Sequence, residues 1–138
     1  MSKAYSKRLR DHAQITAKSI GLQGFTLREG VYFMYTGPCI ETVSEGRFIH
    51  MLGADVVGMS TCPEVTVTVH CGMEVFGISI VTNKSALKSD SDEVVCTIEE
   101  VLDTAAVRSK DLQKLITAMV ETLDLHPTPK NKSGLVQY

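Results

Sequence analysis

The sequence predicts an α/β protein with a three-layer α/β/α arrangement around a mostly parallel sheet. Segments with helical spacing of apolar residues alternate with short runs of β-branched and aromatic residues, and glycine or proline stands at most junctions. Strands that alternate with helices favour parallel pairing with helices on both faces of the sheet. Hydrophobic residues make up 43% and charged residues 22% of the 138 residues, as in ordinary globular domains. No linker or repeat divides the chain, so we expect a single domain.

The first helix is expected over residues 2–20. Its apolar and small residues recur three or four positions apart, at Tyr5, Leu9, Ala13, Thr16 and Ile20. Gly21 is a suitable end for this helix. A buried strand follows over residues 31–35, because this run is continuously aromatic, β-branched or apolar, and Gly37-Pro38 ends it.

A second helix begins at a capping-box pattern, with Thr42 as N-cap and Glu45 three positions later. It is expected to continue through Leu52 and to end at Gly53. A short strand over residues 54–58 comes next.

Residues 64–70 give conflicting signals. Valine and threonine alternate along them, which is a strand pattern. Pro63 stands where the first residue of a helix would be, however, and Gly72 stands where its C-terminal cap would be. We predict a helix, because it preserves the alternation with the clear strand expected at residues 75–81.

A polar loop then leads to a long final helix, which is expected to begin at Asp92 and to continue through Leu123. Its apolar positions keep a spacing of three to four residues, and Pro127 prevents continuation. The polar residues 129–138 are expected to form a flexible tail.

Charge and composition argue against several classes of protein. The net charge is −2 and the only local basic run, at Lys3, Lys7, Arg8 and Arg10, is explained by a solvated helix face, so we expect no nucleic-acid partner. No apolar stretch reaches the roughly 20 residues that span a bilayer, and the first residues lack a secretory pattern. We therefore expect a cytoplasmic protein without membrane contact. The four cysteines form no CxxC pair, and His70-Cys71 lacks nearby partners, so no metal site is expected.

A polar residue or a loop motif follows each predicted strand at its carboxyl end. These are Glu41 after the first, Met59-Ser60 after the second and Asn83 after the third. Ligands of open α/β sheets bind outside these strand ends, so the three features are candidates for one crevice. Simpler explanations remain open: Glu41 as a partner of the helix dipole and Asn83 as a turn residue.

Several longer motifs resemble the trimeric purine nucleoside phosphorylases, in order and in spacing, from Ala4 to about Met119. They are residues 37–42 (GPCIET), 52–61 (LGADVVGMST), 63–65 (PEV) and 81–84 (VTNK), with weaker matches at 70–72 and 75–77. The resemblance implies a partial nucleoside phosphorylase fold, with residues 1–138 as the carboxyl-terminal half. That family cleaves inosine and guanosine with phosphate as co-substrate and without another cofactor.

The resemblance implies roles for individual residues. Glu41 would accept hydrogen bonds from the purine N1–H and from the 2-amino group of guanine. Asn83, the catalytic candidate, would hydrogen-bond N7 and O6, where electron density grows as the glycosidic bond breaks. Met59 would pack on the ribose and Ser60 would contact phosphate. Val57 and Val101 would form apolar walls, although plain core packing explains them equally well.

Three departures from the family stand out. Ile40 replaces the aromatic residue that stacks on the purine, and Ile98 stands at the position of a histidine that reaches the ribose 5′-hydroxyl. The family's other half, which supplies the cationic phosphate ligands, has no counterpart in these residues. We therefore expect weak activity or none for the chain alone, and a homotrimer by resemblance. The alternatives are an inactive fragment that binds purines, or one that docks into family-like trimers.

Overall fold

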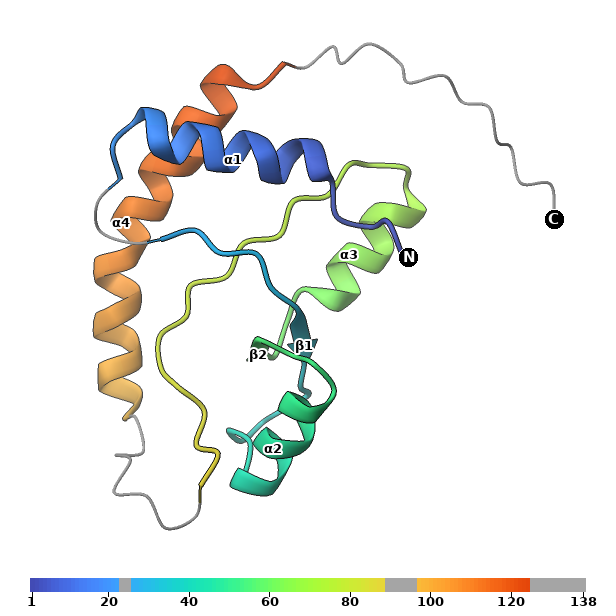
Figure 1. The fold of residues 1–138 in the computed structure, drawn as a ribbon, viewed down its shortest axis with the longest axis vertical. Coiled ribbons are helices and arrows are strands. Elements are labelled where there is room, and N and C mark those ends of the chain that lie inside the picture. Colours follow the sequence, from blue (N-terminus) through green and yellow to red (C-terminus); the bar gives the residue numbers. More distant parts are fainter. Residues whose placement is uncertain (23–25, 89–96, 125–138) are drawn as a thin grey trace, which may run out of the picture.

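The computed structural model describes residues 1–22, 26–88 and 97–124. In chain order the elements are α1 (Lys7–Ser19), β1 (Tyr32–Met34), α2 (Val43–Met51), β2 (Val56–Gly58), α3 (Cys62–His70) and α4 (Ile98–Thr122) (Figure 1). β1 and β2 pair in parallel, with Phe33 opposite Val57 and Met34 opposite Gly58. The alternation of helices with strands as far as α3, and the parallel pairing, are those that the sequence predicts.

Helix α1 begins later than expected. The Ser6 side chain accepts a hydrogen bond from the backbone N–H of Leu9 and so caps the helix, while Tyr5 forms a parallel bridge with Val75. The expected start at residue 2 is wrong by about one turn, because Tyr5 is held by this tertiary pairing. The predicted end is confirmed, since Gly21 has a φ of 63°, a conformation that favours glycine.

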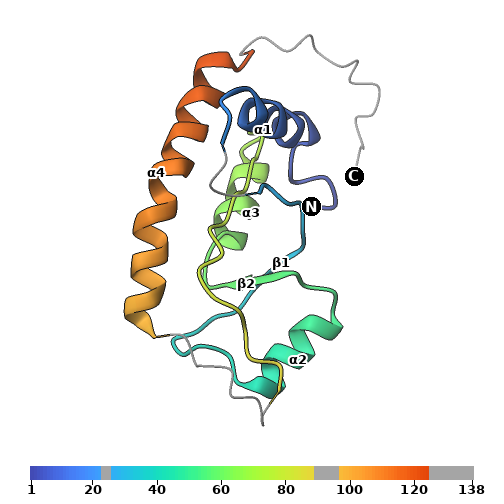
Figure 2. The same cartoon turned by 60° about the vertical axis from the view of Figure 1, so that its left-hand side comes forward.

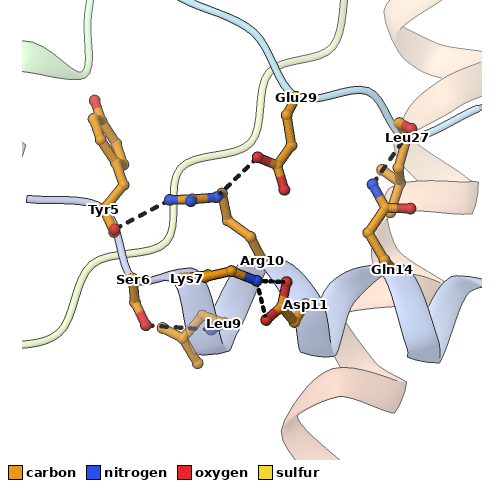
Figure 3. A network of polar contacts seen from close by, with 9 residues as sticks. All are labelled: Tyr5, Ser6, Lys7, Leu9, Arg10, Asp11, Gln14, Leu27 and Glu29. Carbon is orange, nitrogen blue, oxygen red and sulfur yellow. Dashed lines mark hydrogen bonds and ion pairs between the residues drawn. The ribbon is translucent and has the colours of Figure 1, made fainter. Parts of the chain in front are cut away.

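Arg10 joins α1 to the segment that leads into β1, as Figure 3 shows. Its Nη1 donates to the carbonyl of Tyr5 at 3.1 Å, and its Nε lies 3.2 Å from the Glu29 carboxylate. The second contact is an ion pair without hydrogen-bond alignment, since Nε is buried and has no hydrogen-bond partner. On the same helix, Gln14 donates to the carbonyl of Leu27 at 3.4 Å.

The helix predicted over residues 64–70 is confirmed as α3. Thr66 and Thr68 donate through their hydroxyls to the carbonyls four residues earlier, at 2.8 and 2.6 Å. These local bonds satisfy the threonine side chains in a helical backbone, while Val65 alone in α3 is buried. Proline at the start and Gly72 at the end therefore outweigh the alternating pattern.

The regular strand predicted over residues 75–81 is wrong. Val75 makes a single bridge with Tyr5, and the segment then continues without a ladder. Figures 1 and 2 show it running from the end of α3 towards α2. A strand needs a neighbour along its length. Within the described part of this chain, the segment has a strand partner only at Val75, which pairs with Tyr5.

The largest core cluster lies where α1 crosses α4. Ala13, Leu115 and Met119 are buried there, and Phe76 and Ile78 of the extended segment pack against them. His12 of α1 also contacts the carbonyl of Met119 at 3.1 Å. α4 begins with a capping box between Thr97 and Glu100. The expected start at Asp92 is therefore wrong, because the Thr97 side chain caps the helix five residues later. Asp92 itself and the tail at 129–138 lie outside the described residues.

Candidate functional site

The loops that follow β1 and β2 lie against each other. Gly37 has a φ of 70°, and a Cβ atom at this position would come within 2.7 Å of the Met59 sulfur. Glycine is therefore favoured at residue 37 by its backbone conformation, and the Met59 side chain lies in the space beside it. Met59, for which the family resemblance implies a contact with the ribose, thus lies beside the loop that leads to Glu41.

Tyr32 of β1 holds the start of the Met59-Ser60 segment. Its hydroxyl accepts a hydrogen bond from the backbone N–H of Ser60 at 3.1 Å. Its ring fills the space of a side chain at Gly58, where a Cβ atom would lie 3.0 Å from the ring carbon Cζ. The first residue of β1 is thereby joined by its side chain to the segment that follows β2, in addition to the backbone bonds between the strands.

Ser60 precedes an unusual turn centred on Thr61, whose φ and ψ are 80° and −51°. The backbone N–H of Cys62 donates to the carbonyl of Ser60 at 2.9 Å, which makes this a γ-turn of the rare, strained type. A β-branched residue in this region costs on the order of 1–3 kcal/mol, and such strain is concentrated at functional sites. The Ser60 hydroxyl lies 3.2 Å from that of Thr61.

Glu41 is half-buried and accepts a hydrogen bond on Oε1 from the hydroxyl of Ser85. Ser85 follows Asn83 by two residues, so this contact brings the end of the extended segment to the loop after β1. Asn83 is half-buried as well. Its Oδ1 accepts from Thr82 at 2.9 Å, and its amide nitrogen makes a long contact of 3.5 Å with the carbonyl of Lys84. The link between Glu41 and Asn83 runs through Ser85, and their pointing into one crevice stays a prediction.

The carboxylate beside Glu41 has a structural role. Glu45 closes the capping box of α2 with Thr42 and accepts a hydrogen bond from the hydroxyl of Tyr35 at 2.7 Å. The backbone N–H of Thr42, then the Tyr35 hydroxyl, lower the pKa of the Glu45 carboxyl. The same hydrogen bond raises the pKa of the Tyr35 phenol. Thr42 and Glu45 together cap α2. The formation of this helix therefore does not depend on Glu41 as a partner of the helix dipole, the simpler explanation that was left open for it.

The apolar candidates differ in position. Ile40 is 54% and Met59 is 48% exposed, while Val57 is half-buried in β2. Val101 is half-buried in the first turn of α4, at the same end of the molecule as α2 in both Figure 1 and Figure 2. Among the helices and strands, α4 packs mainly on α1. Ile98 is the first residue of α4 and follows its N-cap, Thr97.

Ser60 and Thr61 line a groove between α3 and residues 74–78, together with the carboxylates Glu64 and Glu74. The residues that line it include no lysine or arginine among the part of the chain that the structure describes. A phosphate dianion at Ser60 would therefore meet a neutral hydroxyl and two carboxylates, of which Glu74 is paired with Arg8, and no cation that lines the groove, which is a poor environment for an anion. Within residues 1–22, 26–88 and 97–124, no group of three potential metal ligands comes together, and no helix is long and apolar enough to cross a membrane.

Sequence reasoning did not single out Tyr32, Thr61 or Ser85. Tyr32 is part of an apolar strand, and nothing in the strand pattern predicts what its hydroxyl contacts. A positive φ at Thr61 has no sequence signal, since threonine rarely adopts it. Ser85 lies in the polar loop that follows the last predicted strand, where nothing in the sequence marks one serine over another. Tyr32 and Ser85 become visible only when segments 28 and 44 residues apart meet.

Comparison with known proteins gives one consistent answer. The model of the phosphorylase superfamily matches residues 1–121. The purine nucleoside phosphorylase of Mus musculus is 42% identical over 125 residues, which are 91% of this chain and 43% of the mouse protein. Purine nucleoside phosphorylase 1 of Geobacillus stearothermophilus is 46% identical over 89% of this chain and 43% of its own length.

Solved structures agree with these relatives. A purine nucleoside phosphorylase of Schistosoma mansoni in complex with inosine has a TM-score of 0.82 and 42% identity, over 89% of this chain and 43% of that one. A Schistosoma enzyme in complex with guanosine has a TM-score of 0.83 at the same identity, over 89% of this chain and 44% of that one. The chain thus spans less than half the length of the relatives it matches.

Proposed function

Because the chain belongs to the phosphorylase superfamily, we propose that it is the carboxyl-terminal half of a purine nucleoside phosphorylase and carries the side of the site that binds the base. The reaction would be phosphorolysis of inosine or guanosine to the free base and ribose 1-phosphate. The observation that carries the proposal is the contact between Ser85 and Glu41, which joins the loop after β1 to the segment that holds Asn83.

In this proposal Glu41 accepts from the purine N1–H and Asn83 hydrogen-bonds N7 and O6. The amide nitrogen of Asn83 has only a long contact of 3.5 Å with a carbonyl, so donating to the base costs it little. A donor aimed at the leaving purine is stronger in the transition state than in the ground state, which makes Asn83 the catalytic residue. Met59 packs on the ribose, with Ile40, Val57 and Val101 as apolar walls.

Phosphate would enter as co-substrate, with the Ser60 hydroxyl as its contact from this half. The acidic groove beside Ser60 supports the view that the cationic ligands come from the other half of the site. We extend the proposal to a homotrimer in the cytoplasm, which needs no cofactor or metal and has no nucleic-acid or membrane partner. The specific alternative is a fragment that binds purines or docks into trimers without turnover.

Calorimetric titration of the chain with inosine tests the base site. Glu41→Gln and Asn83→Ala are each expected to weaken binding about tenfold or more, because a buried purine donor or acceptor then lacks its partner. Glu121→Gln, an exposed carboxylate of α4, is the matched control and is expected to change nothing. Equal affinity of all four proteins would refute the assigned base site.

A further inference from the structure

The function proposed above uses the hydrogen bond from Ser85 to Glu41 only as a link between two loops, and assigns Ser85 itself no role towards the purine. The bond joins two half-buried side chains that are 44 residues apart in sequence. A hydroxyl that donates to a carboxylate forms a charge-assisted bond, which is stronger than a bond between neutral groups. Ser85 therefore has a direct influence on the carboxylate that is assigned to the purine.

The position of Ser85 is fixed by its neighbours. Gly46 is buried in α2, and a Cβ atom there would lie 3.2 Å from the carbonyl oxygen of Ala86 and 3.4 Å from the Leu87 side chain. Arg47 donates through Nε to the carbonyl of Leu87 at 2.6 Å. Residues 85–87 are thus held on the first turns of α2, directly beside Glu41, by a close approach that glycine at residue 46 favours.

The bond occupies one of the two carboxylate oxygens. Inosine presents one donor on the edge of the base that faces Glu41, the N1–H group. Guanosine presents two, N1–H and the 2-amino group, and a two-pronged contact uses both oxygens. With Oε1 already accepting from Ser85, a single donor can take Oε2 without competition, while a second donor must share Oε1 or displace the hydroxyl.

We propose that Ser85 is a specificity-determining residue, which favours purines with one donor on this edge over those with two. The proposal rests on the assignment of Glu41 to the base in the function proposed above. It concerns the choice between two nucleosides that differ only in the 2-amino group. General loss of structure would weaken both nucleosides together, so the ratio of their affinities isolates the effect of Ser85.

The experiment is calorimetric titration of the chain, Ser85→Ala, Ser85→Thr and Ser44→Ala with inosine and with guanosine. Ser85→Ala is expected to shift the ratio of affinities about fivefold towards guanosine, the value of one ordinary hydrogen bond. Ser85→Thr keeps the hydroxyl and is expected to restore the original ratio. Ser44→Ala removes an exposed serine of α2 and is expected to leave the ratio unchanged.

Glu41→Gln separates this proposal from the one on which it rests. If Glu41→Gln weakens both nucleosides while Ser85→Ala leaves their ratio unchanged, Ser85 does not set the preference and the base site stands. If neither nucleoside binds, or if binding is independent of Glu41, the base site is refuted and the role of Ser85 with it. Far-ultraviolet circular dichroism of each variant shows that a changed ratio comes from a folded protein.

Discussion

Two glutamates illustrate how single residues are set by their surroundings. Glu45 keeps its negative charge because a backbone N–H and two hydroxyls donate to it, and it serves the start of α2. Glu74 lies just before Val75 and accepts from Arg8 and Ser6 at the start of α1. These hydrogen bonds, that from Arg8 first, lower the pKa of the Glu74 carboxyl. Glu74 thus fastens α1 to the segment that follows α3.

The lowered pKa of Glu74 predicts how stability depends on pH. The unfolded chain takes up a proton on Glu74 near the ordinary pKa of 4.5, whereas the folded chain does so at a lower pH. The contribution of the Arg8–Glu74 pair is therefore full above pH 4.5 and is lost as the pH falls through the folded pKa. Because more than a third of both side chains is exposed, this contribution is at most about 1 kcal/mol.

Urea denaturation of the chain and of Glu74→Gln between pH 6.5 and 3 measures this effect. The chain is expected to be the more stable of the two at pH 6.5, and the difference is expected to shrink as the pH falls below 4.5. A difference that stays constant, or grows at low pH, would contradict the role of the Glu74 carboxylate. Lys7→Gln provides a comparison, since Lys7 pairs with Asp11 within α1 alone.

The burial of Leu115 predicts how much stability the packing of α1 on α4 contributes. Leu115 is fully buried between α1 and α4, whereas Val120 on the same helix is 67% exposed. Leu115→Ala is expected to lower the free energy of unfolding by about 2–5 kcal/mol, because a cavity remains. Val120→Ala is expected to stay within about 0.5 kcal/mol of the original chain. Equal effects in urea denaturation would show that the helices do not pack as described.

At the scale of elements, the helices are defined by their ends more clearly than by their apolar patterns. α2 and α4 both begin with a capping box. α3 has Pro63 in its first turn and is helical in spite of its alternating valines and threonines. Groups at the first turn of a helix have no partner within the helix, so a side chain that satisfies them decides where it begins. These ends also place Glu41 directly before α2 and Ser60 directly before α3.

The cap of α2 can be tested by Thr42→Ala. The change removes the acceptor for the Glu45 backbone N–H and is expected to cost about 1 kcal/mol of stability. Thr42→Ser keeps the hydroxyl and is expected to recover most of this loss. Thermal unfolding followed by circular dichroism measures both. No loss in Thr42→Ala would mean that packing on residues 85–87 alone holds the start of α2.

At the scale of the whole molecule, the described chain leaves apolar surface open. Met51 is 81% exposed and Leu102 is 62% exposed, and the sheet consists of two strands with edges. Open strand edges and exposed apolar side chains are unfavourable unless other polypeptide covers them. The relatives are more than twice as long as this chain, and the remainder of such a protein supplies the covering in the function that we propose.

Activity is the prediction at this scale. The isolated chain is expected to release hypoxanthine from inosine with phosphate at least about a thousandfold more slowly than a complete phosphorylase, because the nucleophile is neither concentrated nor aligned. The assay compares inosine with and without phosphate. The intact mass and a calibrated size measurement show which polypeptides are in the preparation. Turnover near that of a complete enzyme, in a preparation free of other phosphorylases, would require a phosphate site within these residues.

The sequence by itself determined the order of the four helices and of the first two strands, the capping box at Thr42, the helix over residues 64–70 and the family. These features depend on local chemistry: side chains that satisfy helix ends, glycine and proline that end elements, and motifs of fixed spacing. It also placed Glu41, Met59, Ser60 and Asn83 after extended segments, where α/β proteins bind ligands.

Only the tertiary structure decided what these residues touch. Val75 to Val81 has the composition of a strand, yet it pairs at one residue because its ladder depends on neighbouring polypeptide. The partner of Glu41 is a serine 44 residues away, held in place because Gly46 leaves room for its loop. Contacts between distant segments depend on the space that each side chain leaves and on the backbone that fills it. Neither the space around a side chain nor the backbone that fills it can be read from the order of residues alone.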